Sequence, residues 1–135
     1  MLLLDTSVLV RWGDPRRREQ VVPYLSTHSS EPFVTSSLVT YEFFRPAKRR
    51  ENRMEVQSWL GQALDDVKPF TEDASIRAAT IEGALTEQDT SLAHRDLLIA
   101  SHARELDATF VTCDRNDFQR DPVQQLLNVH VIESN

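Results

Sequence analysis

Two residue types that build recognisable motifs are scarce in this chain of 135 residues. The single cysteine, Cys113, excludes an internal disulfide framework and fits a reducing compartment. The chain has only three glycines, and no glycine-rich loop is present. These absences exclude a P-loop and a dinucleotide-binding fingerprint, which both need closely spaced glycines to approach phosphates.

Long apolar runs are also missing. No stretch approaches the roughly 20 apolar residues that span a bilayer, and the N-terminus lacks a basic segment followed by a long apolar one. The composition, 40% hydrophobic and 27% charged, is that of an ordinary globular protein. We therefore expect a single cytoplasmic domain over residues 1–135, with no membrane partner.

The net charge of −6, from 15 basic and 21 acidic residues, argues at face value against a nucleic acid partner. The basic residues are clustered, however, and only two of them are lysines. One cluster is Arg16 to Arg18, and the second comprises Arg45, Lys48, Arg49, Arg50 and Arg53. Each cluster fits either a solvated helix face or a track for an RNA backbone.

Short apolar runs alternate with segments of helical periodicity along the whole chain. The alternation predicts an α/β fold of three layers, in which helices cover both faces of a mostly parallel sheet of about five strands. The expected strands are 1–4, 33–35, 67–70, 109–112 and 128–132. The expected helices are 7–12, 15–28 (interrupted or kinked at Pro23), 37–47, 50–64, 72–87 and 95–106.

The first strand ends at a carboxylate, Asp5, which is followed by Thr6 and Ser7. All three residue types are good helix N-caps, so a purely local role is one interpretation. The other depends on the sheet, because ligands of open α/β sheets bind outside the carboxyl ends of the strands. In that case Thr6 and Ser7 begin a helix and support Asp5 by hydrogen bonds.

Further acids follow the same rule. Glu42 lies on the helix after the second strand, Asp96 begins the helix RDLLIASHAREL, and Asp114 directly follows the fourth strand. Each has an ordinary alternative, as a surface, helix-start or turn residue. Asp117, three residues beyond Asp114, faces the same way if that turn is helical. Carboxylates that converge at one edge repel one another unless a cation compensates them.

An all-oxygen pocket without cysteine or histidine ligands favours Mg²⁺ or Mn²⁺ over Zn²⁺. Such a pocket serves phosphodiester hydrolysis, in which the ion activates water and stabilises the developing charge. Thr112 is placed to orient a carboxylate or the attacking water, or is simply a strand threonine. The four histidines are scattered and none is spaced as a ligand pair.

Four segments make a resemblance specific. LLLDTSVLV, SSLVTYEFFR, RDLLIASHA and TCDRNDF occur in this order and span residues 2–118. The chain resembles the PIN domain family, and within it the VapC-type toxin ribonucleases of prokaryotic toxin–antitoxin pairs.

The resemblance implies endonucleolytic cleavage of RNA that depends on Mg²⁺ or Mn²⁺. It also implies a homodimer and inhibition by a cognate antitoxin that inserts a basic side chain near the acids. Asp117 matches a less regular fifth acidic position of the family. The family's metal-binding acids and its common hydroxyl position match Asp5, Glu42, Asp96, Asp114 and Thr112.

Two alternatives stay open. The first is an acidic-pocket binding module without catalysis; a phospho-acceptor receiver domain is one example, but it needs adjacent N-terminal acids and a late lysine. Here Asp5 stands alone and no lysine follows Lys68. The second is a nuclease of the same fold that acts in RNA maturation or on DNA.

Overall fold

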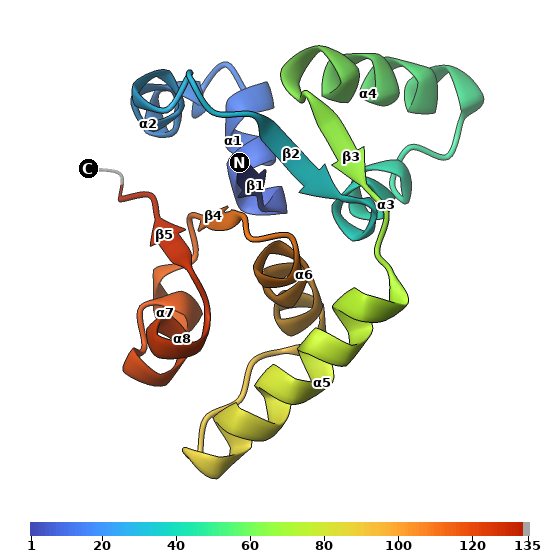
Figure 1. The fold of residues 1–135 in the computed structure, drawn as a ribbon. Coiled ribbons are helices and arrows are strands. Elements are labelled where there is room, and N and C mark those ends of the chain that lie inside the picture. The colour runs from blue at the N-terminus through green and yellow to red at the C-terminus, as the bar shows by residue number, and fades with distance from the viewer. Residues whose placement is uncertain (134–135) are drawn as a thin grey trace.

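The structure, a computed structural model that describes residues 1–133, is built on one parallel sheet (Figure 1). All four strand pairs are parallel, and the strand order is β3-β2-β1-β4-β5. The expected parallel sheet of five strands is therefore confirmed. The strands are β1 (Leu2–Leu4), β2 (Phe33–Ser36), β3 (Asp66–Lys68), β4 (Thr109–Thr112) and β5 (Val129–Val131).

Helices cover both faces of this sheet. Parallel strands need right-handed crossovers, and the chain moves outward from β1 to β3 before it returns to β4 and β5. The crossovers before β3 therefore lie on one face and the later ones on the other (Figure 1). The first group is α1 (Thr6–Gly13), α2 (Val22–Thr27), α3 (Ser37–Phe44) and α4 (Arg50–Ala63). The second is α5 (Glu72–Glu87), α6 (His94–Glu105), α7 (Arg115–Phe118) and α8 (Asp121–Leu126).

Several boundaries differ from the sequence prediction. The expected helix 15–28 is divided into a short 3₁₀ helix, Arg18–Gln20, and α2, because Pro23 lies in the first turn of α2, where its missing N–H is not needed. The helix expected over 37–47 ends at Phe44. The third strand lies at Asp66–Lys68 instead of 67–70, and α8 was not predicted.

The core lies along the two central strands. The three leucines of β1 are buried on both faces of the sheet, as are Phe110 and Val111 of β4. Phe110 packs against Phe118 of α7 at 5.0 Å between ring centroids. Each fully buried side chain of this size contributes about 1.5–3 kcal/mol to stability, so much of the apolar burial that stabilises the fold lies at the centre of the sheet. No helix within residues 1–133 is both long and apolar enough to cross a membrane.

The register of the central strands determines what meets at the carboxyl edge of the sheet. Leu4 of β1 lies opposite Val111 of β4, so the next residues, Asp5 and Thr112, are neighbours. The Asp5 backbone N–H also donates to the Val111 carbonyl at 2.9 Å. The order in which strands are added to the sheet reverses between β1 and β4. Ligands of open α/β sheets bind at such a switch point.

Candidate acidic site at the carboxyl edge of the sheet

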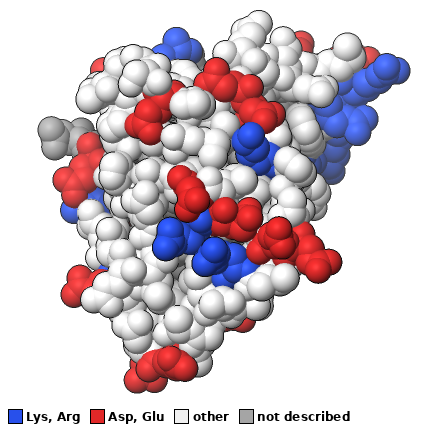
Figure 2. Space-filling view, viewed as in Figure 1, with Lys and Arg blue, Asp and Glu red and all other residues white. Residues whose placement is uncertain are grey.

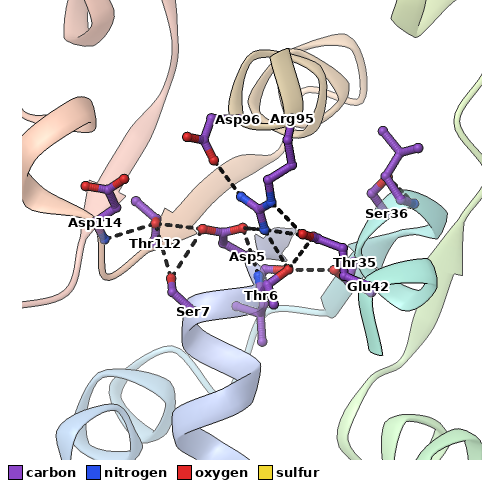
Figure 3. A network of polar contacts seen from close by, with 12 residues as sticks. Asp5, Thr6, Ser7, Thr35, Ser36, Glu42, Arg95, Asp96, Thr112 and Asp114 are labelled. Carbon is purple, nitrogen blue, oxygen red and sulfur yellow. Dashed lines mark hydrogen bonds and ion pairs between the residues drawn. The ribbon is translucent and has the colours of Figure 1, made fainter. Parts of the chain in front are cut away.

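Asp5 is the most buried acid of the site, with 2% of its surface exposed. Its Oδ1 accepts hydrogen bonds from the Thr6 backbone N–H and from Arg95 Nη2, both at 2.8 Å. Its Oδ2 accepts from the hydroxyls of Thr112 at 2.9 Å and Ser7 at 3.2 Å (Figure 3). Asp5 is thus both the N-cap of α1 and a fixed carboxylate of the site, and the predicted support from Ser7 is confirmed.

Glu42 reaches the same place from α3. Its Oε1 accepts from Thr6 Oγ1 at 2.7 Å and from Arg95 Nη2 at 2.9 Å, and its Oε2 accepts from Arg95 Nε at 2.8 Å. Burial opposes ionisation of Glu42, but the hydrogen bonds from Arg95 and Thr6 outweigh it and hold the pKa of Glu42 below its usual value. The hydroxyl of Thr6 therefore supports Glu42, whereas the sequence pattern predicted that it supports Asp5.

Arg95 joins three of the predicted acids, although the sequence motifs did not single it out as a site residue. Besides Asp5 and Glu42, it donates from Nη1 to Asp96 Oδ1 at 2.6 Å. Burial alone would lower the pKa of Arg95, but the surrounding carboxylates raise it above its usual value, so the guanidinium stays charged. The only signal in the sequence was its position immediately before Asp96 in the RDLLIASHA segment.

Asp96, Asp114 and Asp117 form a second group beside Arg95. One carboxylate oxygen of each lies within 4.8 Å of the other two, and all three side chains are partly exposed. Asp114 caps α7, where its Oδ1 accepts from the Asp117 N–H at 3.2 Å. This short helix brings Asp117 to the side of Asp114, as the spacing predicted.

The Asp96 carboxyl group is harder to ionise than an ordinary aspartate. Burial raises the pKa of Asp96, and the nearby carboxylates of Asp5 and Asp114 act in the same direction. The hydrogen bond and charge of Arg95 offset only part of this effect. A carboxylate in this state gains from a cation placed beside it.

The donor chemistry of the second group fits a small divalent ion. Two oxygens that share Mg²⁺ at about 2.1 Å lie at most about 4.2 Å apart. The oxygens of Asp96, Asp114 and Asp117 are within 4.8 Å of one another, so small side-chain rotations suffice to bring them to one ion. Glu42 does not belong to this group, because Arg95 engages both of its oxygens.

Charged residues are unevenly spread around the site. Figure 2 shows acidic side chains across the middle of one face with some basic ones among them, and further basic residues gathered at a corner, over the beginning of α4. Within residues 1–133, no member of this cluster forms an ion pair with an acid. We call it the α4 basic cluster: Arg45, Lys48, Arg49, Arg50 and Arg53.

The molecule is thus a parallel α/β domain with an acidic, hydroxyl-supported cluster outside the carboxyl ends of its central strands. The PIN domain family model matches residues 2–121. The chain therefore belongs to the PIN domain family, as the sequence motifs predicted.

Several solved structures share this fold. FitAcB from Neisseria gonorrhoeae is similar with a TM-score of 0.75, 23% identity and 96% of each chain covered. VapBC2 from Rickettsia felis, bound to a DNA fragment from its promoter, is similar with a TM-score of 0.75, 23% identity and 98% of each chain covered. VapBC-5 from Mycobacterium tuberculosis, of the VapBC family of toxin–antitoxin systems, is similar with a TM-score of 0.63 and 23% identity. The match covers 97% of this chain and 96% of that chain. No curated protein sequence matches at a significant level.

Proposed function

We propose that this protein is a metal-dependent endoribonuclease and the toxin of a type II toxin–antitoxin system. The observation that supports this most directly is the meeting of Asp5, Asp96 and Asp114, from three separate segments, at the carboxyl edge of a PIN-domain sheet. In this proposal residues 1–135 are one domain, and RNA hydrolysis takes place in the cytoplasm.

The carboxylates of Asp96, Asp114 and Asp117 would hold Mg²⁺ or Mn²⁺, with Asp5 adjacent. Such an ion supplies activation of water and neutralisation of the charge that develops on the phosphate. The protein's own contribution is to fix these groups. The Thr112 hydroxyl donates to Asp5 and accepts from the Asp114 N–H at 3.1 Å, so it holds two of the acids in relation to each other.

A negative pocket needs positive flanks to hold a polyanion. The α4 basic cluster follows α3, the helix that carries Glu42, and Arg45 is close enough to contribute to lowering the pKa of Glu42. Exposed arginines without acidic partners keep their full attraction for phosphate. We therefore assign this cluster to the RNA backbone.

An antitoxin and a second copy of the chain are the protein partners in this proposal. Support for the antitoxin comes from the solved structures of similar fold, because VapBC-5 belongs to a toxin–antitoxin family. The surface also has an apolar groove of about 450 Å³ between α1 and α4, whose lining includes Leu9, Val10, Val56 and Trp59. In this proposal the antitoxin covers this groove.

The central test is cleavage of single-stranded RNA by purified protein with Mn²⁺ or Mg²⁺. Asp5→Asn and Asp114→Asn should abolish cleavage and relieve growth inhibition on expression. Asp107→Asn is the matched control, since Asp107 is an exposed aspartate just after α6, far along the helix from Asp96, and its side chain pairs with Arg104 at 4.0 Å. RNA that stays intact with either ion, together with normal growth on expression, would overturn the proposal and leave the non-catalytic binding module or a nuclease that acts on DNA.

The partner is tested separately. Co-expression with the product of the adjacent reading frame should restore growth, and the two proteins should purify together. Replacing Val56 with Glu, in the apolar groove, should abolish co-purification while cleavage of RNA persists. Sedimentation of the toxin alone should give the mass of a dimer. A nuclease of RNA maturation would instead leave growth unaffected and need no inhibitor.

A further inference from the structure

Arg95 divides the acidic site into two halves. We propose that its guanidinium is a permanent cation for the half formed by Asp5 and Glu42, so that the site binds one divalent ion instead of two. The single ion then belongs to the half formed by Asp96, Asp114 and Asp117. This inference rests on the proposed metal dependence and specifies how many ions the nuclease uses.

All three guanidinium nitrogens of Arg95 are engaged with the site (Figure 3). Nε and Nη2 hold the two oxygens of Glu42 in a fork, at 2.8 and 2.9 Å. Nη2 also donates to Asp5 Oδ1 and, at 2.6 Å, to Thr6 Oγ1, while Nη1 donates to Asp96 Oδ1. A planar guanidinium matches the two oxygens of a carboxylate and fixes its orientation.

The oxygens of the first half are fully used by these contacts. Asp5 Oδ1 has two N–H donors, and Asp5 Oδ2 has two hydroxyl donors. Both oxygens of Glu42 accept from Arg95. A divalent ion between Asp5 and Glu42 would have to displace the guanidinium while lying next to its charge.

Burial makes the charge of Arg95 necessary in this half. The Asp5 side chain is 4% exposed and that of Glu42 is 22% exposed. These two carboxylates are largely shielded from water, and Thr6 links them by its backbone N–H to Asp5 and its hydroxyl to Glu42, so they need a compensating cation. An arginine cannot lose its proton, so it provides that cation at every pH.

The second half has the opposite character. Asp96, Asp114 and Asp117 bring an oxygen each within 4.8 Å of the others, and Arg95 contacts only Asp96 among them. Asp96 thus faces both halves, with Oδ1 on Arg95. Asp117 also pairs with Arg120 Nη2 at 3.8 Å, and an ion held by the three aspartates neutralises the charge that these two arginines leave.

The test counts bound Mn²⁺ per chain by calorimetry and by electron paramagnetic resonance of the free ion. The wild-type protein should bind one ion. Arg95→Met, which keeps an apolar stem and removes the charge, should bind two, and Arg95→Met combined with Glu42→Gln should return to one. Arg104→Met is the matched control on the same helix and should bind one ion.

Glu42→Gln in the otherwise unchanged chain provides a second measurement that does not depend on the folding of Arg95→Met. It should keep one ion with a Kd within about threefold of wild type, whereas Asp114→Asn should weaken binding at least about 100-fold, since even residues that only orient a ligand contribute 10–100-fold. Loss of the ion in Glu42→Gln would overturn the inference.

The remaining outcomes separate this inference from the proposed function. Two ions in wild type, or one ion in a folded Arg95→Met protein, would overturn the role of Arg95 and leave the metal-dependent nuclease standing. No bound Mn²⁺ in wild type would overturn both.

Discussion

Thr112 Oγ1 donates a hydrogen bond to Asp5 Oδ2 at 2.9 Å, and both residues are buried. They follow directly on the paired residues Val111 and Leu4, so the parallel register of β1 and β4 brings them together. Since the same hydroxyl accepts from the Asp114 N–H, one threonine positions acids from two segments of the site.

Replacing Thr112 with Val should therefore affect both stability and activity. The change leaves Asp5 with one hydrogen bond fewer in a buried place, which costs about 1–3 kcal/mol. Cleavage should fall about 10–100-fold, the usual effect of removing a partner that orients a metal-site residue. Urea unfolding and RNA cleavage with Mn²⁺ measure the two effects.

The conservative variant Thr112→Ser should keep both properties, because it retains the hydroxyl. Thr109→Val changes the other end of the same strand, where the threonine hydroxyl accepts only from the exposed Asn128 side chain, and should cost little. Equal activity of Thr112→Val and wild type would show that the hydroxyl is only a strand residue.

The ionised carboxylate of Asp96 should lower the free energy of unfolding at neutral pH in the absence of a metal ion. Its raised pKa means that the folded state holds the proton more tightly than the unfolded state, where the value is near 3.8. Its favourable contribution is complete below pH 3.8 and is lost as the pH rises through the raised pKa. In EDTA, Asp96→Asn should thus raise the Tm by a few degrees at pH 7, and by less near pH 3.5.

Mn²⁺ should make the wild-type protein more stable than Asp96→Asn. The ion stabilises the ionised carboxylate, so saturating Mn²⁺ should raise the Tm of wild type more than that of Asp96→Asn. Thermal unfolding with EDTA and with Mn²⁺ gives the comparison. A lower Tm for Asp96→Asn in EDTA would mean that the contact with Arg95 outweighs the cost of burial.

Much of the fold was predictable because the two central strands are short runs whose middle residues are apolar and buried. Leu2 to Leu4, and Phe110 with Val111, put apolar side chains on both faces of the sheet, which fits strands covered by helices on both sides. β3 was misplaced by one or two residues because its Asp66 and Val67 are exposed at the sheet edge, where no burial pattern exists to follow. The division of residues 15–28 depended on Pro23, which is compatible with either a kink or an interruption of a helix.

The candidate site was predictable only to the level of strand ends. Acids that follow parallel strands must approach one another, so their convergence needed no knowledge of side chains. Which acids contact which partners could not be predicted. That Glu42 binds Arg95, and that Asp117 lies beside Asp96 and Asp114, depends on side-chain rotamers and on the length of the arginine side chain. Arg95 was overlooked because its partners Asp5 and Glu42 are 90 and 53 residues away.

His102 should make the protein sensitive to acid. It is 1% exposed, its Nδ1 lies 2.9 Å from Ser36 Oγ, and its ring packs against Phe70. Ser36 in turn caps α3 by accepting from the Leu38 N–H. Burial lowers the pKa of His102 below 6.5, so the imidazole is neutral in the folded protein at pH 7.

The sign of the pH effect follows from this shift. Below pH 6.5 His102 is protonated in the unfolded chain but stays neutral in the folded protein. The free energy of unfolding should therefore fall as the pH decreases from 6.5 to the lowered pKa. Urea unfolding between pH 5 and 7.5 measures this slope. His102→Gln should flatten it, and the exposed His94→Gln should not. A wild-type free energy of unfolding that is independent of pH there would contradict the assignment.

The α4 basic cluster should determine how RNA binding depends on salt. Binding is measured with Asp114→Asn as the background, so that the RNA stays intact. Replacing Arg49, Arg50 and Arg53 with Gln removes exposed charges that engage no acid within residues 1–133. The affinity should fall, and the slope of log K against log salt should become shallower by about 0.7 for each phosphate that the protein no longer neutralises.

The first arginine cluster supplies the matched control, with the same charge change at another place. Arg17 is paired with Asp14 at 3.0 Å, and Arg18 donates to the Trp12 carbonyl. Because two of the three side chains already have partners, replacing Arg16, Arg17 and Arg18 with Gln should change the salt slope by less than the α4 variant does. An equally shallow slope in the two variants would show that net charge alone attracts the RNA, and the track along α4 would have to be abandoned.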